Sequence, residues 1–197
     1  MADYIMNLMI FIITAVLVVL IPFKDTKEKT FGAPQMSRMR KSFRFFTVQS
    51  NAFCAVTAFL MCLFPQAQWA WILKYVGTAA VMVTFLTVMF FLGPAAGYKA
   101  MLSGDSFFMH LLTPLMAFVS FSFLEKRGMS FKLMLLGLVP VILYGILYMV
   151  KIFAKDETRR WEDFYGFNRG GKWYIALPAM MVGSFLICLG LWALQNI

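Results

Sequence analysis

Long apolar stretches without a charged residue alternate along this chain with short polar segments. Six such stretches contain no Asp, Glu, Lys or Arg: residues 4–23, 45–64, 75–92, 107–124, 133–150 and 173–194. A bilayer core about 30 Å thick is crossed by roughly 20 apolar residues of helix, so each stretch is long enough, or nearly long enough, to span a membrane. The pattern predicts an all-α polytopic membrane protein, a six-transmembrane-helix bundle that forms a single integral membrane domain over residues 1–197.

The amino-acid composition excludes several other classes of protein. Of the 197 residues, 61% are apolar and 14% are charged, whereas a soluble domain has about 25% charged and 45–50% apolar residues. These values exclude a soluble enzyme, a nucleic-acid-binding domain and a disordered chain. The first apolar stretch is expected to be a transmembrane helix and not a signal peptide, because Asp3 stands where a basic residue is usual and no small-residue cleavage site follows.

The basic residues are distributed unevenly among the loops. Fourteen of the 18 Lys and Arg residues fall in the first, third and fifth loops, and the other four are Lys74, Lys126, Arg127 and Lys132. The positive-inside rule therefore predicts that the odd-numbered loops are cytoplasmic and that both termini lie outside. The same charge would attract anionic lipid headgroups. No nucleic-acid partner is expected, since the basic residues are not interleaved with stacking aromatic residues.

Polar residues inside two of the stretches recur at spacings of three, four and seven, which places them on one face of a helix. The first set is Thr47, Ser50, Asn51, Cys54, Thr57 and Ala58, and the second is His110, Thr113, Pro114, Ala117 and Ser120. Polar residues in hydrocarbon usually face the interior of a bundle. We expect both faces to point inward, with Tyr144 and Tyr148 of the fifth stretch and Cys188 of the sixth added to the same interior.

Thr47 and His110 are the candidate site. Both lie within a few residues of the start of their stretches, so they are expected at similar depth in the same leaflet, beneath a fifth loop long enough to fold over the helix ends. A histidine is the usual base that activates a hydroxyl nucleophile. Two structural alternatives stay open: the Thr47 hydroxyl bonds back to the Phe43 carbonyl, and His110 is an interhelical hydrogen-bond donor. No metal or cofactor is expected, because His110 is the single histidine and the three cysteines lack paired spacing.

Two short motifs resemble a known family. Phe-Arg-Phe-Phe-Thr-Val-Gln-Ser-Asn at 43–51 and Phe-Met-His-Leu-Leu-Thr-Pro-Leu at 108–115 resemble the androgen-induced-gene / androgen-dependent TFPI-regulating protein family and the bacterial Pr6Pr-type membrane proteins grouped with it. The animal members are multi-helix threonine hydrolases that cleave fatty acid esters of hydroxy fatty acids. The resemblance implies a Thr nucleophile at Thr47, a His base at His110 and, for a bacterial-type member, the plasma membrane of a bacterium.

The resulting hypothesis is an intramembrane lipid-ester hydrolase or acyl transferase, whose partner is a membrane lipid or another acyl ester that enters from the bilayer. The candidate oxyanion donors are one of the side chains of Gln49, Asn51 and Asn168 and a backbone N–H at the start of the second stretch. The candidate residues for orienting His110 are Asp105, Tyr144, Tyr148 and Asp163. Two alternatives come from other classes. A non-catalytic lipid-binding or scaffold protein needs the same cavity without the chemistry, and a small-solute transporter needs a polar path through both leaflets.

Overall fold

The computed structural model describes residues 1–20 and 35–197 of the chain. Within these residues the regular structure is helical, and six helices are long and apolar enough to cross a membrane. They cover Ala2–Leu20, Phe46–Leu63, Gln68–Ala96, Asp105–Leu124, Phe131–Ile152 and Trp173–Asn196. The predicted fold class, an all-α polytopic membrane protein with six spans, is therefore confirmed.

Three spans are single α-helices, and three change helical pitch along their length. The single helices are α1 (Ala2–Leu20), α3 (Phe46–Leu63) and α11 (Trp173–Asn196). The third span joins α4 (Gln68–Thr87), a π-helical turn (Val88–Leu92) and α5 (Gly93–Ala96). The fourth joins α7 (Asp105–Phe107), a π-helical turn (Phe108–Leu112), α8 (Thr113–Val119) and a second π-helical turn (Ser120–Leu124). The fifth joins α9 (Phe131–Met134), a 3₁₀ turn (Leu135–Leu138) and α10 (Val139–Ile152). Short elements outside the spans are α2 (Gln35–Ser42), α6 (Tyr98–Met101) and a 3₁₀ turn at Arg169–Gly171.

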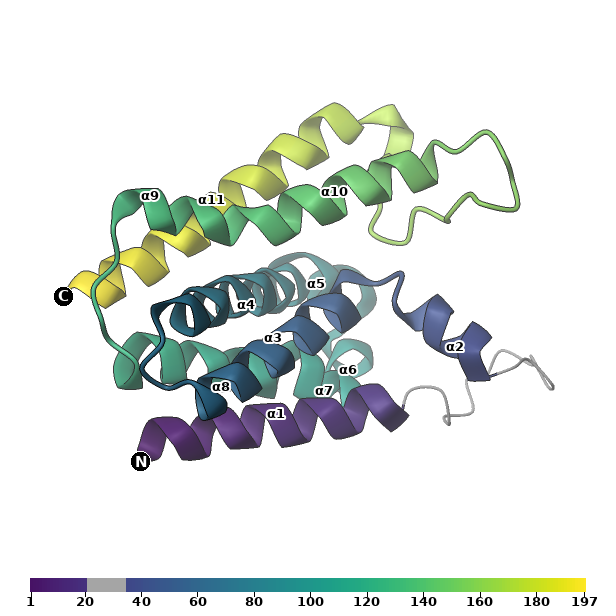
Figure 1. Cartoon of the computed structure of the whole chain (residues 1–197). Coiled ribbons are helices and arrows are strands. Elements are labelled where there is room, and N and C mark those ends of the chain that lie inside the picture. The colour runs from purple at the N-terminus through teal and green to yellow at the C-terminus, as the bar shows by residue number, and fades with distance from the viewer. Residues whose placement is uncertain (21–34) are drawn as a thin grey trace.

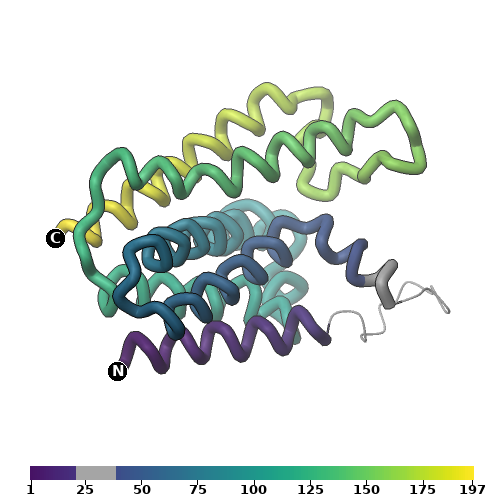
Figure 2. Tube along the Cα trace, viewed as in Figure 1, coloured from purple at the N-terminus to yellow at the C-terminus, as the bar shows by residue number. Residues whose placement is uncertain are grey.

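The helix α4 is the centre of the bundle. In its most apolar window 61% of the residues are buried, against 17% in α1 and in α11. It contacts α3 and α8 on one side and α10 and α11 on the other, while α1 packs on α3 and α8 (Figure 1). The pair α10 and α11 forms a separate layer along the bundle, as the Cα trace shows (Figure 2).

The two ends of the bundle differ. Both termini lie at one end, together with the loops 64–67 and 125–130, and we call this end the terminal face (Figure 1). The opposite end carries α2, α6 and the loop 153–172, and we call it the odd-loop face. The predicted grouping of termini and loops is therefore present.

Two glycines inside the spans allow close contacts between neighbouring helices of the bundle. A Cβ atom at Gly77 would lie 2.6 Å from Thr57 Oγ1, and a Cβ at Gly137 would lie 2.6 Å from both Cys188 Sγ and the Tyr75 hydroxyl. The Tyr75 hydroxyl in turn donates to the Met134 carbonyl, with an O···O distance of 2.6 Å. These contacts hold the α9–α10 span against α4.

The predicted span boundaries differ from the structure, most of all in the third span. The third span begins at Gln68 and not at residue 75, so Lys74 lies inside α4 and is fully buried. Treating Lys74 as a loop residue was wrong, because its charge interrupts the apolar stretch but not the helix. The sixth span also extends to Asn196, beyond the predicted end at 194. The predicted end of the first span, residues 21–23, lies outside the described residues.

Candidate functional site

The two polar faces predicted from the sequence do point into the bundle. In α3, Ser50, Asn51, Cys54, Thr57 and Ala58 are buried, and in the fourth span Thr113, Pro114, Ala117 and Ser120 are buried. Tyr144, Tyr148 and Cys188 are also buried. Thr47 and His110, at the odd-loop end of these faces, are half-buried. The inward orientation of the two faces is therefore confirmed, and Thr47 and His110 lie at the edge of the interior.

Thr47 sits in the first turn of α3, where backbone N–H groups lack partners within the helix. The Phe46 N–H donates to the Tyr165 hydroxyl, with an N···O distance of 2.9 Å. The same hydroxyl also interacts with the backbone and with the side-chain hydroxyl of Thr47. Burial raises the pKa of the Tyr165 phenol, and its contacts with the Phe46 and Thr47 groups act in the opposite direction. Thr47 thus faces a neutral phenol that sequence analysis did not identify.

Tyr165 is held there by a folded loop. Asp163 accepts hydrogen bonds from the Tyr148 hydroxyl at 2.8 Å and from the backbone N–H groups of Phe167 and Asn168 at 2.9 and 2.7 Å. The Tyr148 hydroxyl accepts the Tyr165 N–H at 3.1 Å. One carboxylate therefore fixes the loop to α10, and the loop covers the start of α3 as the sequence predicts.

Aromatic side chains complete this cover. The rings of Phe45 and Phe164 lie 4.6 Å apart, and those of Phe46 and Tyr144 lie 5.0 Å apart. The Tyr144 hydroxyl donates to the Arg44 carbonyl at 2.6 Å. Tyr144 therefore holds the start of α3, and Tyr148 holds the loop. The described hydrogen bonds of these two tyrosines do not involve His110.

His110 lies in the π-helical turn that precedes Pro114. Because proline has no N–H, it cannot donate to the His110 carbonyl four residues earlier, and such wide turns are frequent at functional sites. His110 Nδ1 lies 2.7 Å from the Met101 carbonyl oxygen. A carbonyl oxygen only accepts, so Nδ1 carries the proton and Nε2 of the neutral ring is left as the basic nitrogen.

Asn51 connects the two halves of the site. Its Nδ2 donates to the Thr47 carbonyl at 2.8 Å and to the Met109 carbonyl at 3.0 Å. The first bond is within α3 and the second reaches the residue before His110. The reverse orientation of this amide would place Oδ1 against two carbonyl oxygens, so the assignment is firm. Asn51 Nδ2 therefore bonds once within its own helix and once to the fourth span, and Asn51 Oδ1 is buried without a hydrogen-bond partner.

The other predicted residues have these positions. Gln49 Nε2 donates to the Phe43 carbonyl at 2.6 Å, which is the acceptor that the structural alternative assigned to Thr47. Asn168 lies in the covering loop, where its backbone N–H bonds to Asp163. Asp105 is the first residue of α7, at the odd-loop face. The roles assigned to them in oxyanion binding or in orienting His110 stay predictions.

A second polar cluster, which sequence analysis missed, lies near the terminal face. Lys74 Nζ donates to Asn7 Oδ1 at 2.5 Å, and Asn7 Nδ2 donates to Glu125 Oε1 at 2.5 Å. Ser120 Oγ donates to the same carboxylate oxygen at 2.7 Å, and Trp71 Nε1 donates to the Glu125 carbonyl at 2.8 Å. The side chains of all five residues are buried, and Glu125 Oε2 has no hydrogen-bond partner. The sequence feature that could have indicated this cluster is Asn7, a polar residue inside an otherwise apolar stretch.

The described residues hold no group of three or more His, Cys, Asp or Glu side chains that would bind a metal ion. Lys74, Asn7 and Glu125 do not make a cation site either, because the lysine ammonium occupies the position beside the amide oxygen.

The fold and these buried side chains define a polytopic helical membrane protein. Comparisons with known protein families, with curated proteins and with solved structures give no match. The class is therefore what the structure establishes, and any activity has to be argued from the chain's own residues.

Proposed function

We propose that the protein is an intramembrane lipid-ester hydrolase or acyl transferase in which Thr47 is the nucleophile and His110 the base. The observation that carries the proposal is the double hydrogen bond of Asn51, which fixes the Thr47 turn beside the turn that bears His110. The tautomer set by the Met101 carbonyl adds a free basic nitrogen. The family resemblance of the two motifs agrees with this assignment of roles.

The proposed reaction uses these groups in sequence. Thr47 Oγ1 attacks the ester carbonyl carbon while its proton passes to His110 Nε2. The tetrahedral intermediate then expels the alcohol, which takes the proton from the imidazolium, and an acyl-threonine remains. Water completes hydrolysis by the same proton transfers, and an acceptor alcohol in its place gives acyl transfer. Such general base catalysis typically contributes a factor of about 10² to 10⁴.

The start of α3 is the proposed oxyanion site. The Phe46 N–H points at the Tyr165 oxygen, and the Thr47 backbone also interacts with it. Exposed N–H groups at a helix start favour negative charge. We infer that the substrate oxyanion takes the position of the Tyr165 oxygen, after the loop that carries Tyr165 has moved. This would replace the side-chain donors expected at Gln49 and Asn51, whose described amide hydrogen bonds go to backbone carbonyls.

The test is labelling of the purified protein with a fluorophosphonate probe, which reacts with activated hydroxyl groups. The wild type is expected to label, and Thr47→Ala and His110→Ala are expected to lose the label. Thr87→Ala is the matched control, because Thr87 is also half-buried near the odd-loop end of its span. An unlabelled wild type, or a Thr47→Ala variant that labels fully while folded, would refute the proposed nucleophile.

A non-catalytic lipid-binding protein is the second candidate, and a specific observation favours it. The Thr47 carbonyl accepts hydrogen bonds from Ser50 and Asn51, and its hydroxyl already has Tyr165 as a partner, so the residue also has a structural role. Lipid that copurifies equally with wild type and with Thr47→Ala, combined with no fluorophosphonate labelling, would favour this candidate. Transport is less well supported, because Gly77 and Thr57 pack α4 directly against α3 and leave no space for a polar path between them.

A further inference from the structure

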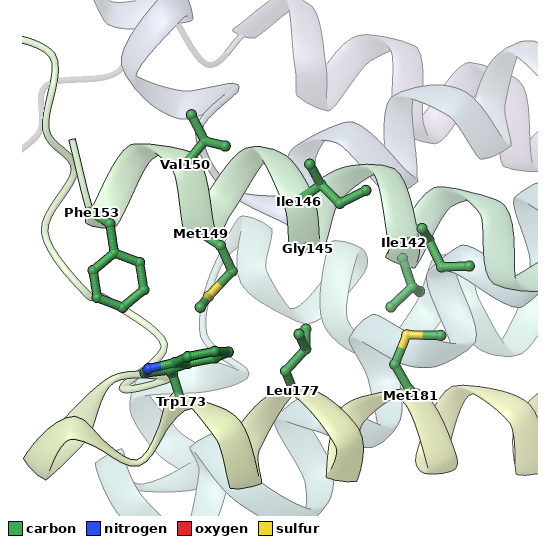
Figure 3. A pocket seen from close by; sticks show the side chains of 10 residues that line it. Ile142, Gly145, Ile146, Met149, Val150, Phe153, Trp173, Leu177 and Met181 are labelled. Carbon is green, nitrogen blue, oxygen red and sulfur yellow. The ribbon is translucent and has the colours of Figure 1, made fainter.

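A groove opens between α10 and α11 on the side of α10 away from the candidate site. Its volume is about 460 Å³, within the range of roughly 300–1,000 Å³ of pockets that hold small organic molecules. Val141, Gly145 and Met149 line it from α10, and Trp173, Leu177 and Met181 line it from α11. Met149 and Phe153 point toward α11, and Trp173, Leu177 and Met181 point toward α10 (Figure 3).

The groove faces the bilayer and not the bundle. Ile146 and Val150, which also line it, are 60% and 63% exposed. Tyr144 and Tyr148 are buried, and their rings contact the covering loop and the start of α3. The helix α10 therefore separates the groove from Thr47, and an occupant of the groove would not reach the proposed nucleophile.

The lining selects a hydrocarbon. All ten residues that surround the groove are aliphatic, aromatic, methionine or glycine residues, so an occupant finds no polar side chain except the Trp173 indole. Gly145 contributes to the depth, because a Cβ added there would meet only Leu177 Cδ1, at 3.6 Å. In a bilayer, the occupant with a matching chemistry is an acyl chain.

The odd-loop end of the groove is charged. The rings of Phe153 and Trp173 close this end, with centroids 6.2 Å apart. Lys172 directly precedes Trp173, and Lys155 follows Phe153 by two residues; both lysines are exposed. Tryptophan at such a boundary is typical of the headgroup level of a membrane.

The carboxylates of this loop do not neutralise those lysines in the described structure. Asp156 pairs with Arg159 and Glu157 with Arg160, each at 3.4 Å, and Glu162 forms no salt bridge with either lysine within the described part of the chain. Asp163 accepts hydrogen bonds from the Tyr148 hydroxyl and from the backbone N–H groups of Phe167 and Asn168. Lys155 and Lys172 therefore present positive charge where an acyl chain leaves the groove, which is where a lipid phosphate would lie.

We propose that the α10–α11 groove is a binding site for an anionic phospholipid of the leaflet on the odd-loop side. One acyl chain fills the groove between Val141 and Trp173, and the phosphate is held by Lys155 and Lys172. Each basic residue near a membrane surface adds about 1 kcal/mol of attraction to anionic lipid, so loss of both lysines should weaken binding roughly 20- to 30-fold. This site is independent of the chemistry proposed at Thr47.

The experiment uses the full chain in phosphatidylcholine nanodiscs that contain a small fraction of a photo-activatable lipid. Phosphatidylglycerol and phosphatidylcholine that carry the same diazirine acyl chain are compared, and crosslinked peptides are mapped by mass spectrometry. We expect phosphatidylglycerol to label α10 and α11 residues of the groove well above phosphatidylcholine. Lys155→Gln/Lys172→Gln should reduce this preference, whereas Lys41→Gln/Lys99→Gln, which removes two exposed lysines of the same face, should not.

A second pair of variants tests the groove itself. Met149→Trp fills it, because the Met149 side chain points into the groove (Figure 3). Leu143→Trp places the same side chain on a residue of α10 that is 64% exposed and outside the lining. Loss of labelling in the first variant alone supports the site. Equal labelling by both lipids, equal effects of the two tryptophans, or crosslinks between two copies of the chain across this groove would overturn it. None of these results depends on whether Thr47 reacts with a fluorophosphonate.

Discussion

Replacing Lys74 or Glu125 singly should destabilise the protein far more than replacing both. Lys74 is fully buried and Glu125 is 6% exposed, and Asn7 links them by two hydrogen bonds of 2.5 Å. Glu125→Gln keeps an oxygen that accepts from Asn7 and Ser120 and removes only the negative charge. Lys74→Met keeps most of the aliphatic stem and removes only the positive charge. Each single variant therefore leaves one buried charge without its counter-charge.

The expected loss in the free energy of unfolding follows from leaving one charge buried without its counter-charge. Removing one partner of a buried ion pair typically costs about 3–5 kcal/mol, whereas replacing both by apolar or neutral groups of similar volume is often close to neutral. We expect about 3–5 kcal/mol for each single variant and less than about 2 kcal/mol for Lys74→Met/Glu125→Gln. The coupling energy of the double-mutant cycle should then be several kcal/mol in the favourable direction.

The assay is reversible unfolding of the purified protein in mixed micelles with increasing SDS, which gives the free energy of unfolding for each variant. Lys132→Met is the control, since Lys132 lies at the start of the next span and is exposed; a surface change of this kind should stay within about 0.5 kcal/mol. If the double variant loses the sum of the two single losses, the two charges do not compensate each other.

Three further predictions concern packing and the covering loop. Gly137→Ala should lower the free energy of unfolding by about 1–3 kcal/mol, because its Cβ would lie 2.6 Å from two side-chain atoms. The control is Gly190→Ala, whose Cβ would meet nothing within 4 Å, and this variant should be neutral or stabilising by up to about 1 kcal/mol. Unfolding in SDS measures both variants. Asp163→Ala removes three described hydrogen bonds of the loop and should speed tryptic cleavage within 153–172 without changing the unfolding of the spans; unchanged cleavage would contradict this. Because burial raises the pKa of Tyr165 above its ordinary value of 10.0, its stabilising effect should be complete below pH 10 and lost as the pH rises through the higher folded-state value. The ultraviolet difference between wild type and Tyr165→Phe follows the ionisation, and SDS unfolding of both proteins at each pH measures the change in stability.

The spans and their inward faces could be predicted because both depend on local sequence. A membrane imposes one requirement, an apolar helix of fixed length, and the six stretches meet it regardless of their neighbours. The polar faces follow from the helical period, so Ser50, Asn51 and Thr113 could be placed inside without any knowledge of packing. The boundary at Lys74 was missed for the opposite reason, since a buried lysine is possible only with partners from other helices.

The arrangement around Thr47 depended on contacts that no local pattern encodes. Tyr165 is distant from Thr47 in sequence and lies in a loop without a repeating pattern. Asp163 was considered as a partner of His110, but its described hydrogen bonds lie within the loop and to Tyr148. Aromatic and charged residues in a loop indicate that it packs on something, and only the structure identifies what it covers.

The two ends of the bundle have different physical characters, and this difference supports the location of the proposed site. Near the terminal face, buried charges join α1, α4 and the end of the fourth span through short hydrogen bonds, and opening this cluster would expose isolated charges to hydrocarbon. At the odd-loop face, Thr47 and His110 are half-buried. The loop covers Thr47 and the start of α3 through the Tyr165 hydroxyl and aromatic rings, and its Asp163 carboxylate bonds to the neutral Tyr148 hydroxyl and not to a cation. Moving that loop exchanges hydrogen bonds without separating buried ions, so it requires much less free energy. The lipid ester of the proposed reaction would therefore enter at the odd-loop face, while the opposite end keeps α1, α4 and the fourth span in place.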